Sequence, residues 1–147
     1  MRFLGIDLGT ASLKLAIVDE DGREIAFSNA AYTVSTRHPG WAETPVDEWW
    51  NALVAAASRL PANEREAVRG IGFSGQMHGV VLTDDEGHAL RPAMLWPDTR
   101  ARDLLDAWPS PQTNPVAPGM AGPLLRWIAL NEPALLREAR WAFSTYS

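Results

Sequence analysis

Three short segments of this chain combine polar side chains with glycine in the way that ligand sites do. The first segment contains Asp7, Gly9, Thr10, Ser12 and Lys14. A carboxylate at the end of an apolar strand suits a magnesium ion, and glycine lets backbone amides approach phosphate oxygens closely. The hydroxyl and ammonium groups that follow can donate to the same phosphates. The segment predicts a nucleotide-phosphate site, and a tight hairpin turn in which Asp7 caps its own backbone is the alternative.

The second segment is Gln76-Met77-His78, bracketed by Gly75 and Gly79. It follows a predicted strand, and ligands in open α/β sheets bind beyond the carboxyl ends of strands. Gln76 and His78 can hydrogen-bond sugar hydroxyls, and Met77 can pack on a carbon face. The segment favours a ligand site. The alternative is a plain strand-to-loop turn in which His78 bonds to nearby backbone.

The third segment contains Trp96, Asp98 and Arg100. A flat aromatic face beside directional hydrogen-bonding groups suits a polyol. The alternative places Trp96 in the core and Arg100 in solvent, with Asp98 capping the next helix. For Asp98 the sequence favours neither capping nor ligand binding, and both can hold together.

The composition of the chain excludes several classes of binding partner and site. The formal net charge is −5 and no basic stripe stands out, so we expect no nucleic-acid partner. The chain has no cysteine, which excludes disulfides and thiolate metal sites and fits a cytoplasmic protein. No apolar run approaches the ~20 residues that a membrane-spanning helix needs, so we expect no membrane association.

The elements around the first two segments follow from periodicity. Residues 3–8, 12–18 and 23–32 are predicted strands joined by short turns, which form an antiparallel meander. A helix is predicted after Thr44, a suitable N-cap, with Trp49 and Trp50 both facing the sheet. Residues 67–74 are a fourth strand, which the crossover helix should make parallel to a strand of the meander.

The second half of the chain predicts smaller elements. Residues 80–90 indicate a hairpin, and a helix is expected from about Asp98, with apolar residues at helical spacing up to Trp108. Residues 109–122 are rich in Pro and Gly and indicate a loop. Two short helices and a fifth strand at 141–143 follow. This order predicts an α/β fold with a mixed sheet, an antiparallel meander followed by crossover helices.

Taken together, the segments resemble the FGGY carbohydrate kinases, and xylulokinases most closely among them. The resemblance covers essentially the whole chain in order. It is carried by Gly5 to Thr10, His38-Pro39 with Trp41-Ala42-Glu43, Trp49-Trp50, Gly75-Gln76-Met77-His78-Gly79, Leu95-Trp96-Pro97-Asp98-Thr99-Arg100 and Pro118-Gly119 with Leu124-Leu125 and Trp127.

The resemblance implies a ribonuclease H-like, actin-type ATPase domain that uses ATP and Mg²⁺ to phosphorylate a ketose, D-xylulose first among the candidates. It implies that Asp7 acts at the metal, through water, and that Gly9, Thr10, Ser12 and Lys14 contact the phosphates. It assigns the ketose pocket to Gln76, Met77, His78, Trp96, Asp98 and Arg100.

Residues 1–147 are expected to be an incomplete N-terminal domain of such a kinase. The catalytic base, an aspartate, and the adenine-binding segments are expected beyond Ser147, in a missing C-terminal domain, so the chain alone should be inactive. The alternative is a stand-alone, non-catalytic module that binds a sugar or a partner. A truncated domain exposes apolar surface, which we expect a partner or self-association, for example as a homodimer, to cover.

Overall fold

A computed structural model describes residues 1–108 and 115–145, which form two compact units. Unit 1 comprises residues 1–33 and 47–76, and unit 2 comprises residues 34–46 and the described residues from Met77 onward. The chain therefore crosses between the units three times: after Thr33, after Val46 and after Gln76. Of the predicted loop 109–122, residues 109–114 lie outside the described part of the chain.

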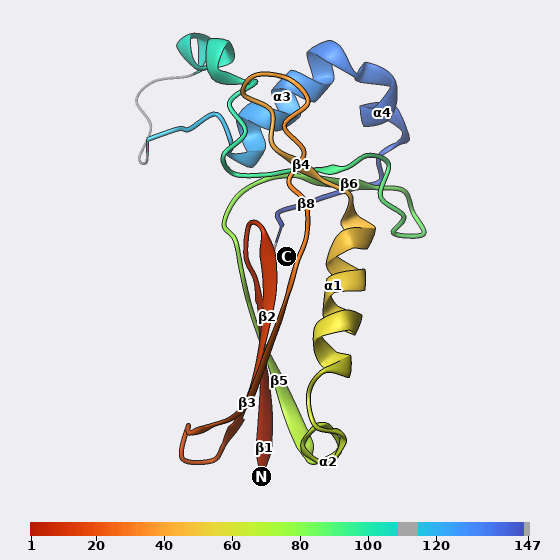
Figure 1. Cartoon of the computed structure of the whole chain (residues 1–147). Helices are drawn as coiled ribbons and strands as arrows, with labels where there is room; N and C mark the ends of the chain where they lie inside the picture. The colour runs from red at the N-terminus through yellow and green to blue at the C-terminus, as the bar shows by residue number, and fades with distance from the viewer. Residues whose placement is uncertain (109–114, 146–147) are drawn as a thin grey trace. The chain divides into compact units, whose positions relative to one another are not determined.

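Unit 1 is built on a four-stranded mixed sheet (Figure 1). Its strands, in spatial order, are β3 (Glu24–Ala31), β2 (Ser12–Asp19), β1 (Arg2–Leu8) and β5 (Val68–Gly75). The first three pair antiparallel, and β5 pairs parallel to β1. The predicted meander and the predicted parallel fourth strand are both confirmed.

One face of this sheet carries the core of unit 1. Leu13, Leu15 and Ile17 alternate along β2 and are buried, because a strand turns every second side chain to the same face. The helix α1 (Val46–Ser58) runs beside the sheet (Figure 1) and leads through the short helix α2 (Ala62–Glu66) into β5. Helix α1 connects the meander to its parallel strand, as the sequence predicted.

The two tryptophans of α1 differ, and the prediction that both face the sheet is wrong for Trp50. Trp49 is buried with Ala52 and Ala56, whereas Trp50 is 67% exposed. Successive residues of a helix point about 100° apart, so neighbours cannot both lie in a narrow buried stripe. The buried residues are three and four positions apart, which is the spacing of one helix face.

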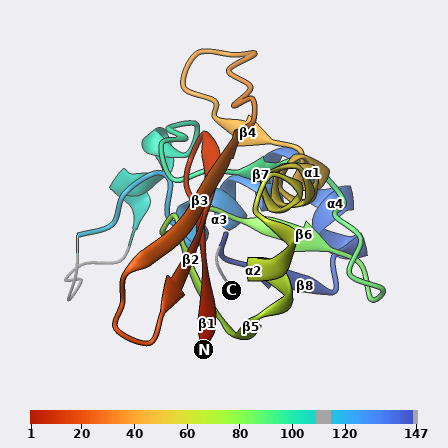
Figure 2. The same cartoon turned by 60° about the horizontal axis from the view of Figure 1, so that its bottom comes forward.

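Unit 2 consists of short elements around its own apolar cluster. Two antiparallel two-stranded sheets pair β4 (Glu43–Thr44) with β7 (Ala93–Met94) and β6 (Val81–Thr83) with β8 (Trp141–Phe143) (Figure 2). The helices are η1 (Arg102–Ala107), α3 (Ala121–Asn131) and α4 (Pro133–Glu138). Its buried cluster comprises Val80, Leu82, Met94, Ala101, Leu124 and Ile128.

Two expectations for unit 2 need correction. The helix predicted from Asp98 is a 3₁₀ helix that begins at Arg102, because Asp98 and Arg100 engage in the buried contacts described below. The predicted fifth strand exists as β8, but it pairs with β6 and not with the four-stranded sheet. Within the described residues, no helix combines the length and the apolar character needed to cross a bilayer.

The adjacent tryptophans of α1 give a matched test of this core. We expect Trp49→Ala to lower the free energy of unfolding by about 3–5 kcal/mol, because it removes a buried ring. Trp50→Ala should change the same quantity by no more than about 0.5 kcal/mol. Urea denaturation of both variants measures the difference, and equal losses would contradict the observed orientation of α1.

Candidate functional site

A row of polar side chains crosses the sheet of unit 1 at the carboxyl end of β1. The register places Asn29 opposite Lys14, Lys14 opposite Asp7, and Asp7 opposite Ser74. Directly paired residues share a face of the sheet, so these four side chains lie in one line. Lys14 Nζ and Asp7 Oδ2 are 2.9 Å apart, and both side chains are about half exposed (46% and 45%). The pair is therefore open to a ligand.

Three of the four residues in the next row of the same face are small. This row contains Phe27, Ala16, Gly5 and Gly72, each opposite the next across the strands. The small residues leave a hollow of about 350 Å³ on the sheet, bordered by Asp7 and Lys14. The carboxylate and the ammonium group therefore stand at the edge of an open depression.

Two long-range hydrogen bonds to the carbonyl oxygen of Gly9 hold the β1–β2 turn. The Tyr32 hydroxyl donates to the Gly9 oxygen, and Gln76 Nε2 donates to the same oxygen at 3.5 Å. Within the turn, the Gly9 amide donates to the Ser12 oxygen at 3.0 Å. A Cβ atom at Gly9 would lie 2.9 Å from that oxygen, so the turn needs glycine for its close approach.

Burial, together with the smaller effect of the negative charge of Asp7, raises the pKa of Tyr32 to about 12. Both effects disfavour the phenolate. The hydroxyl therefore stays protonated, and stays a donor to Gly9, across the physiological pH range.

In unit 2, the turn after Gln76 has an unusual backbone. His78 has a φ of 61°, and Gly79 follows with a φ of 72°. Among the residues that the structure describes, His78 is the only non-glycine residue with positive φ. Its side chain is exposed, and Met77 is 66% exposed. A strained residue with an exposed side chain is typical of ligand-binding turns.

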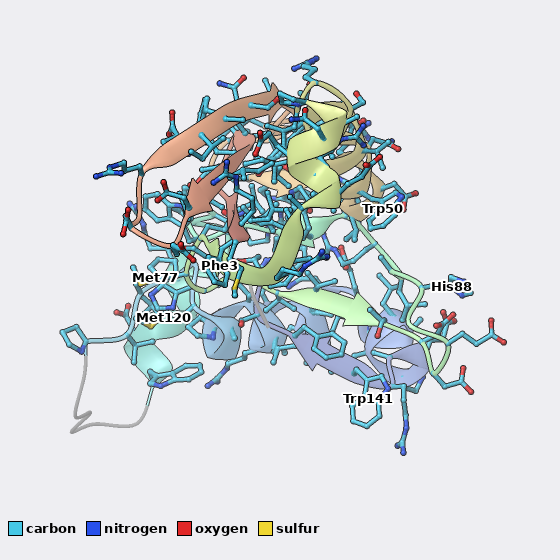
Figure 3. The ribbon with its side chains drawn as sticks, turned by 90° about the horizontal axis from the view of Figure 1, so that it is seen from below. Phe3, Trp50, Met77, His88, Met120 and Trp141 are labelled. Atoms are coloured by element: carbon cyan, nitrogen blue, oxygen red, sulfur yellow. The ribbon has the colours of Figure 1, made fainter. Side chains whose placement is uncertain are left out.

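A second exposed aromatic side chain belongs to the same unit. Trp96 is 51% exposed, so the alternative that placed it in the core is wrong. A Cβ atom at Gly119 would lie 1.8 Å from the Trp96 carbonyl oxygen, so these segments are in direct backbone contact. The Gly79 amide donates to the Gly119 oxygen at 3.1 Å, and these two segments carry Met77 and Met120, which Figure 3 labels.

Asp98 and Arg100 are buried in a network of charges. Their side chains are 0% and 1% exposed, so Arg100 is not solvated as the alternative proposed. Asp98 accepts hydrogen bonds from Arg100 Nε and Nη2 at 2.7–3.0 Å and from the Ala42 amide at 2.8 Å. It also accepts from the Arg100 amide at 3.0 Å, which closes a local turn two residues before η1 begins.

The network extends through a third segment. Arg100 Nη2 also donates to Glu43 at 2.7 Å, and Arg91 bridges Glu43 and Glu132. The Arg100 guanidinium lies 3.6 Å from the ring centre of Trp41, a cation–π contact. These contacts fix residues 40–43 against residues 95–100, so Asp98 and Arg100 hold the segment that carries Trp96.

The predicted site residues therefore divide by exposure. Asp7, Lys14, Met77, His78 and Trp96 present accessible side chains, whereas Gln76, Asp98 and Arg100 are buried and support the segments beside them. Sequence reasoning missed Tyr32 and did not assign Ser74 a role. Ser74 depends on the strand register and Tyr32 on a contact across 23 residues, so no local pattern signals either.

Known proteins of one family resemble this chain in sequence and in fold. The family description "FGGY family of carbohydrate kinases, N-terminal domain" matches residues 2–147. The xylulose kinase of Escherichia coli K12 is 37% identical over 145 residues, which cover 92% of this chain and 30% of the relative. The crystal structure of a xyloylose kinase from Brucella ovis has a TM-score of 0.91 and 36% identity, over 99% of this chain and 32% of that one.

The structure of xylulose kinase from Rhodospirillum rubrum is also similar, with a TM-score of 0.88, 29% identity and coverage of 99% of this chain and 32% of that one. The mixed sheet is thus that of an actin-type ATPase domain of the sugar-kinase class. This chain belongs to the FGGY family of carbohydrate kinases and matches its N-terminal domain. It spans about 30% of the length of the curated relatives that it matches.

The raised pKa of Tyr32 predicts a loss of stability at high pH. The folded-state pKa is about 12 against an ordinary value of 10, so the unfolded chain loses its proton first. The stabilisation is complete below pH 10 and is lost as pH rises towards 12. Tyr32→Phe should lack this component and show a shallower decline in urea midpoint over that range.

A Tyr146→Phe background leaves Tyr32 as the only tyrosine, so ultraviolet absorbance then follows its ionisation directly. Titration near the ordinary value of 10 would contradict the buried, hydrogen-bonded position.

The buried network predicts that Asp98 contributes to folding. Asp98→Asn leaves Arg100 without one of its two carboxylate partners, and we expect a loss of about 3–5 kcal/mol in the free energy of unfolding. Asp85→Asn, at an exposed position between β6 and β7, is the control and should cost at most about 0.5 kcal/mol. If chemical denaturation gives the two variants the same stability, the network does not hold this segment.

Proposed function

We propose that this chain supplies the phosphate loop and the sugar-contacting turn of an ATP-dependent ketose kinase, with D-xylulose as the leading substrate and xylulose 5-phosphate as product. The observation that carries the proposal is the left-handed His78, whose strained backbone presents an exposed side chain. Membership of the FGGY family and the names of the relatives support the same reaction.

The phosphate loop is the β1–β2 turn. Gly9 and Thr10, with Ser12 and Lys14 after them, would bind the phosphates of ATP, and Asp7 would bind Mg²⁺ through water. Residues 1–108 and 115–145 contain no cluster of three or more acidic or histidine side chains that could hold a metal. A single accessible carboxylate nevertheless fits Mg²⁺, which keeps several waters and takes further oxygens from phosphates. When bound, Mg²⁺ would supply positive charge to those phosphates.

The sugar-contacting residues would be those that remain exposed in unit 2. His78 would hydrogen-bond a ketose hydroxyl, Met77 would pack on carbon atoms, and the ring of Trp96 would cover an apolar face of the sugar. The burial of Gln76, Asp98 and Arg100 favours an indirect role, in which they hold the backbone next to these contacts.

Phosphoryl transfer also needs groups that we assign to the rest of the kinase. The relatives are about three times as long as this chain, and we propose that a C-terminal domain supplies the catalytic aspartate base, the adenine site and water exclusion. The apolar side chains exposed on unit 1, such as Phe27 and Phe73, would pack against that polypeptide.

The test combines binding and turnover on the purified chain. We expect calorimetry to detect weak binding of D-xylulose, while a coupled assay detects no ketose-dependent ADP. His78→Ala should weaken binding about fivefold through the loss of a hydrogen bond, with almost unchanged stability. His88→Ala, at an exposed histidine of the turn after β6, is the control and should bind as the parent does.

Each alternative gives a different result. Steady ADP production would show that the chain is complete enough for catalysis. Absence of binding to D-xylulose and to other ketoses would contradict the assignment of the sugar site and favour a partner-binding module. A large loss of stability in His78→Ala, with binding intact, would make His78 a structural residue.

A further inference from the structure

The His78–Gly79 turn is held by contacts from distant parts of unit 2. Thr145 donates two hydrogen bonds to the His78 carbonyl oxygen, from its amide at 3.1 Å and from its hydroxyl at 2.9 Å. Gly79 in turn donates to the Gly119 oxygen. A non-glycine residue keeps a left-handed conformation only where its surroundings determine it, and here three long-range hydrogen bonds do so.

The packing below Gly79 leaves little freedom for this turn. A Cβ atom at Gly79 would lie 2.5 Å from Thr145 Cγ2 and 2.6 Å from the Met94 carbonyl oxygen. Thr145 itself is buried. Its methyl group therefore occupies the space that a side chain at Gly79 would need, and its hydroxyl and amide bind the carbonyl oxygen of His78. Thr145 thus contacts both residues of the turn.

We propose that Thr145 is a positioning residue of the ketose site, which acts by holding His78 in the left-handed conformation that presents its imidazole to the sugar. This inference rests on the proposed function of His78. Thr145 has no role in the chemistry. If the Thr145 hydroxyl is lost, the backbone amide of Thr145 is the donor that remains to the His78 carbonyl oxygen. The turn can then relax towards a conformation with negative φ at His78, in which the imidazole points in another direction.

The chain offers a closely matched control. Thr83 is also buried in unit 2, and its hydroxyl has no hydrogen-bond partner within the described part of the chain. Thr→Val at either position exchanges a hydroxyl for a methyl group of similar size. Only Thr145→Val removes a hydrogen bond to the turn, so the comparison separates positioning from a general effect of the substitution.

The experiment measures two quantities on the full chain: the affinity for D-xylulose by calorimetry and the amide hydrogen exchange of Gly79 by NMR. We expect Thr145→Val to weaken D-xylulose binding about fivefold and to accelerate exchange at Gly79 by a similar factor. Amides of β1 and β2 should exchange as in the parent. Thr145→Ser, which keeps the donor, should restore both quantities to within about twofold, and Thr83→Val should match the parent.

Unchanged affinity and unchanged exchange in Thr145→Val would overturn the proposal, as would an equal loss of affinity in Thr83→Val. If the parent chain binds no D-xylulose, the proposed function fails, and exchange alone decides whether Thr145 holds the turn. Faster exchange at Gly79 in Thr145→Val, reversed in Thr145→Ser, would then show that Thr145 holds the His78–Gly79 turn. Unchanged exchange would show that it does not.

Discussion

The parallel pairing of β1 with β5 is the constraint on which the candidate site depends. Because both strands run in the same direction, their carboxyl ends meet at one edge of the sheet, and Asp7 comes to lie beside Ser74. The ladder continues into the loops, since the Gln76 amide donates to the Leu8 oxygen at 2.8 Å. A shift of one residue in this register would place Phe73 or Gly75 beside Asp7 and would turn Ser74 to the opposite face of the sheet.

The buried charges of unit 2 fix the orientation of the backbone more than they add to the net stability of the fold. Removing charges from water is costly, and well-packed apolar residues often stabilise a protein equally well. Asp98 and Arg100 offset this cost through hydrogen bonds between their side chains, a hydrogen bond from the Ala42 amide to Asp98 and a cation–π contact of Arg100 with Trp41. Apolar packing would not specify the orientation of the backbone around Trp96, whereas this set of directional bonds does.

The sequence allowed the elements of unit 1 to be predicted, because alternating and helical apolar patterns are local. The predictions of ligand-binding segments also rested mostly on local composition. Partners distant in sequence could not be predicted in this way: no local pattern indicated that Arg100 would be buried against Glu43 and Trp41. The same limit explains Trp50, since the helical spacing of apolar residues placed it in the core, whereas the orientation of α1 leaves it exposed.

The two units support their exposed functional side chains by different physical means. In unit 1, strands of seven and eight residues pair continuously, and the ladder itself fixes Asp7 and Lys14. The paired strands of unit 2 are two or three residues long, so backbone ladders contribute few hydrogen bonds there. Side chains such as Thr145 and Asp98 supply the missing donors and acceptors to the backbone. Substitutions of single polar residues should therefore destabilise the local backbone more in unit 2 than in unit 1. In unit 2 a single side-chain hydrogen bond holds the backbone where no strand pairing does, whereas in unit 1 the neighbouring hydrogen bonds of the ladder remain.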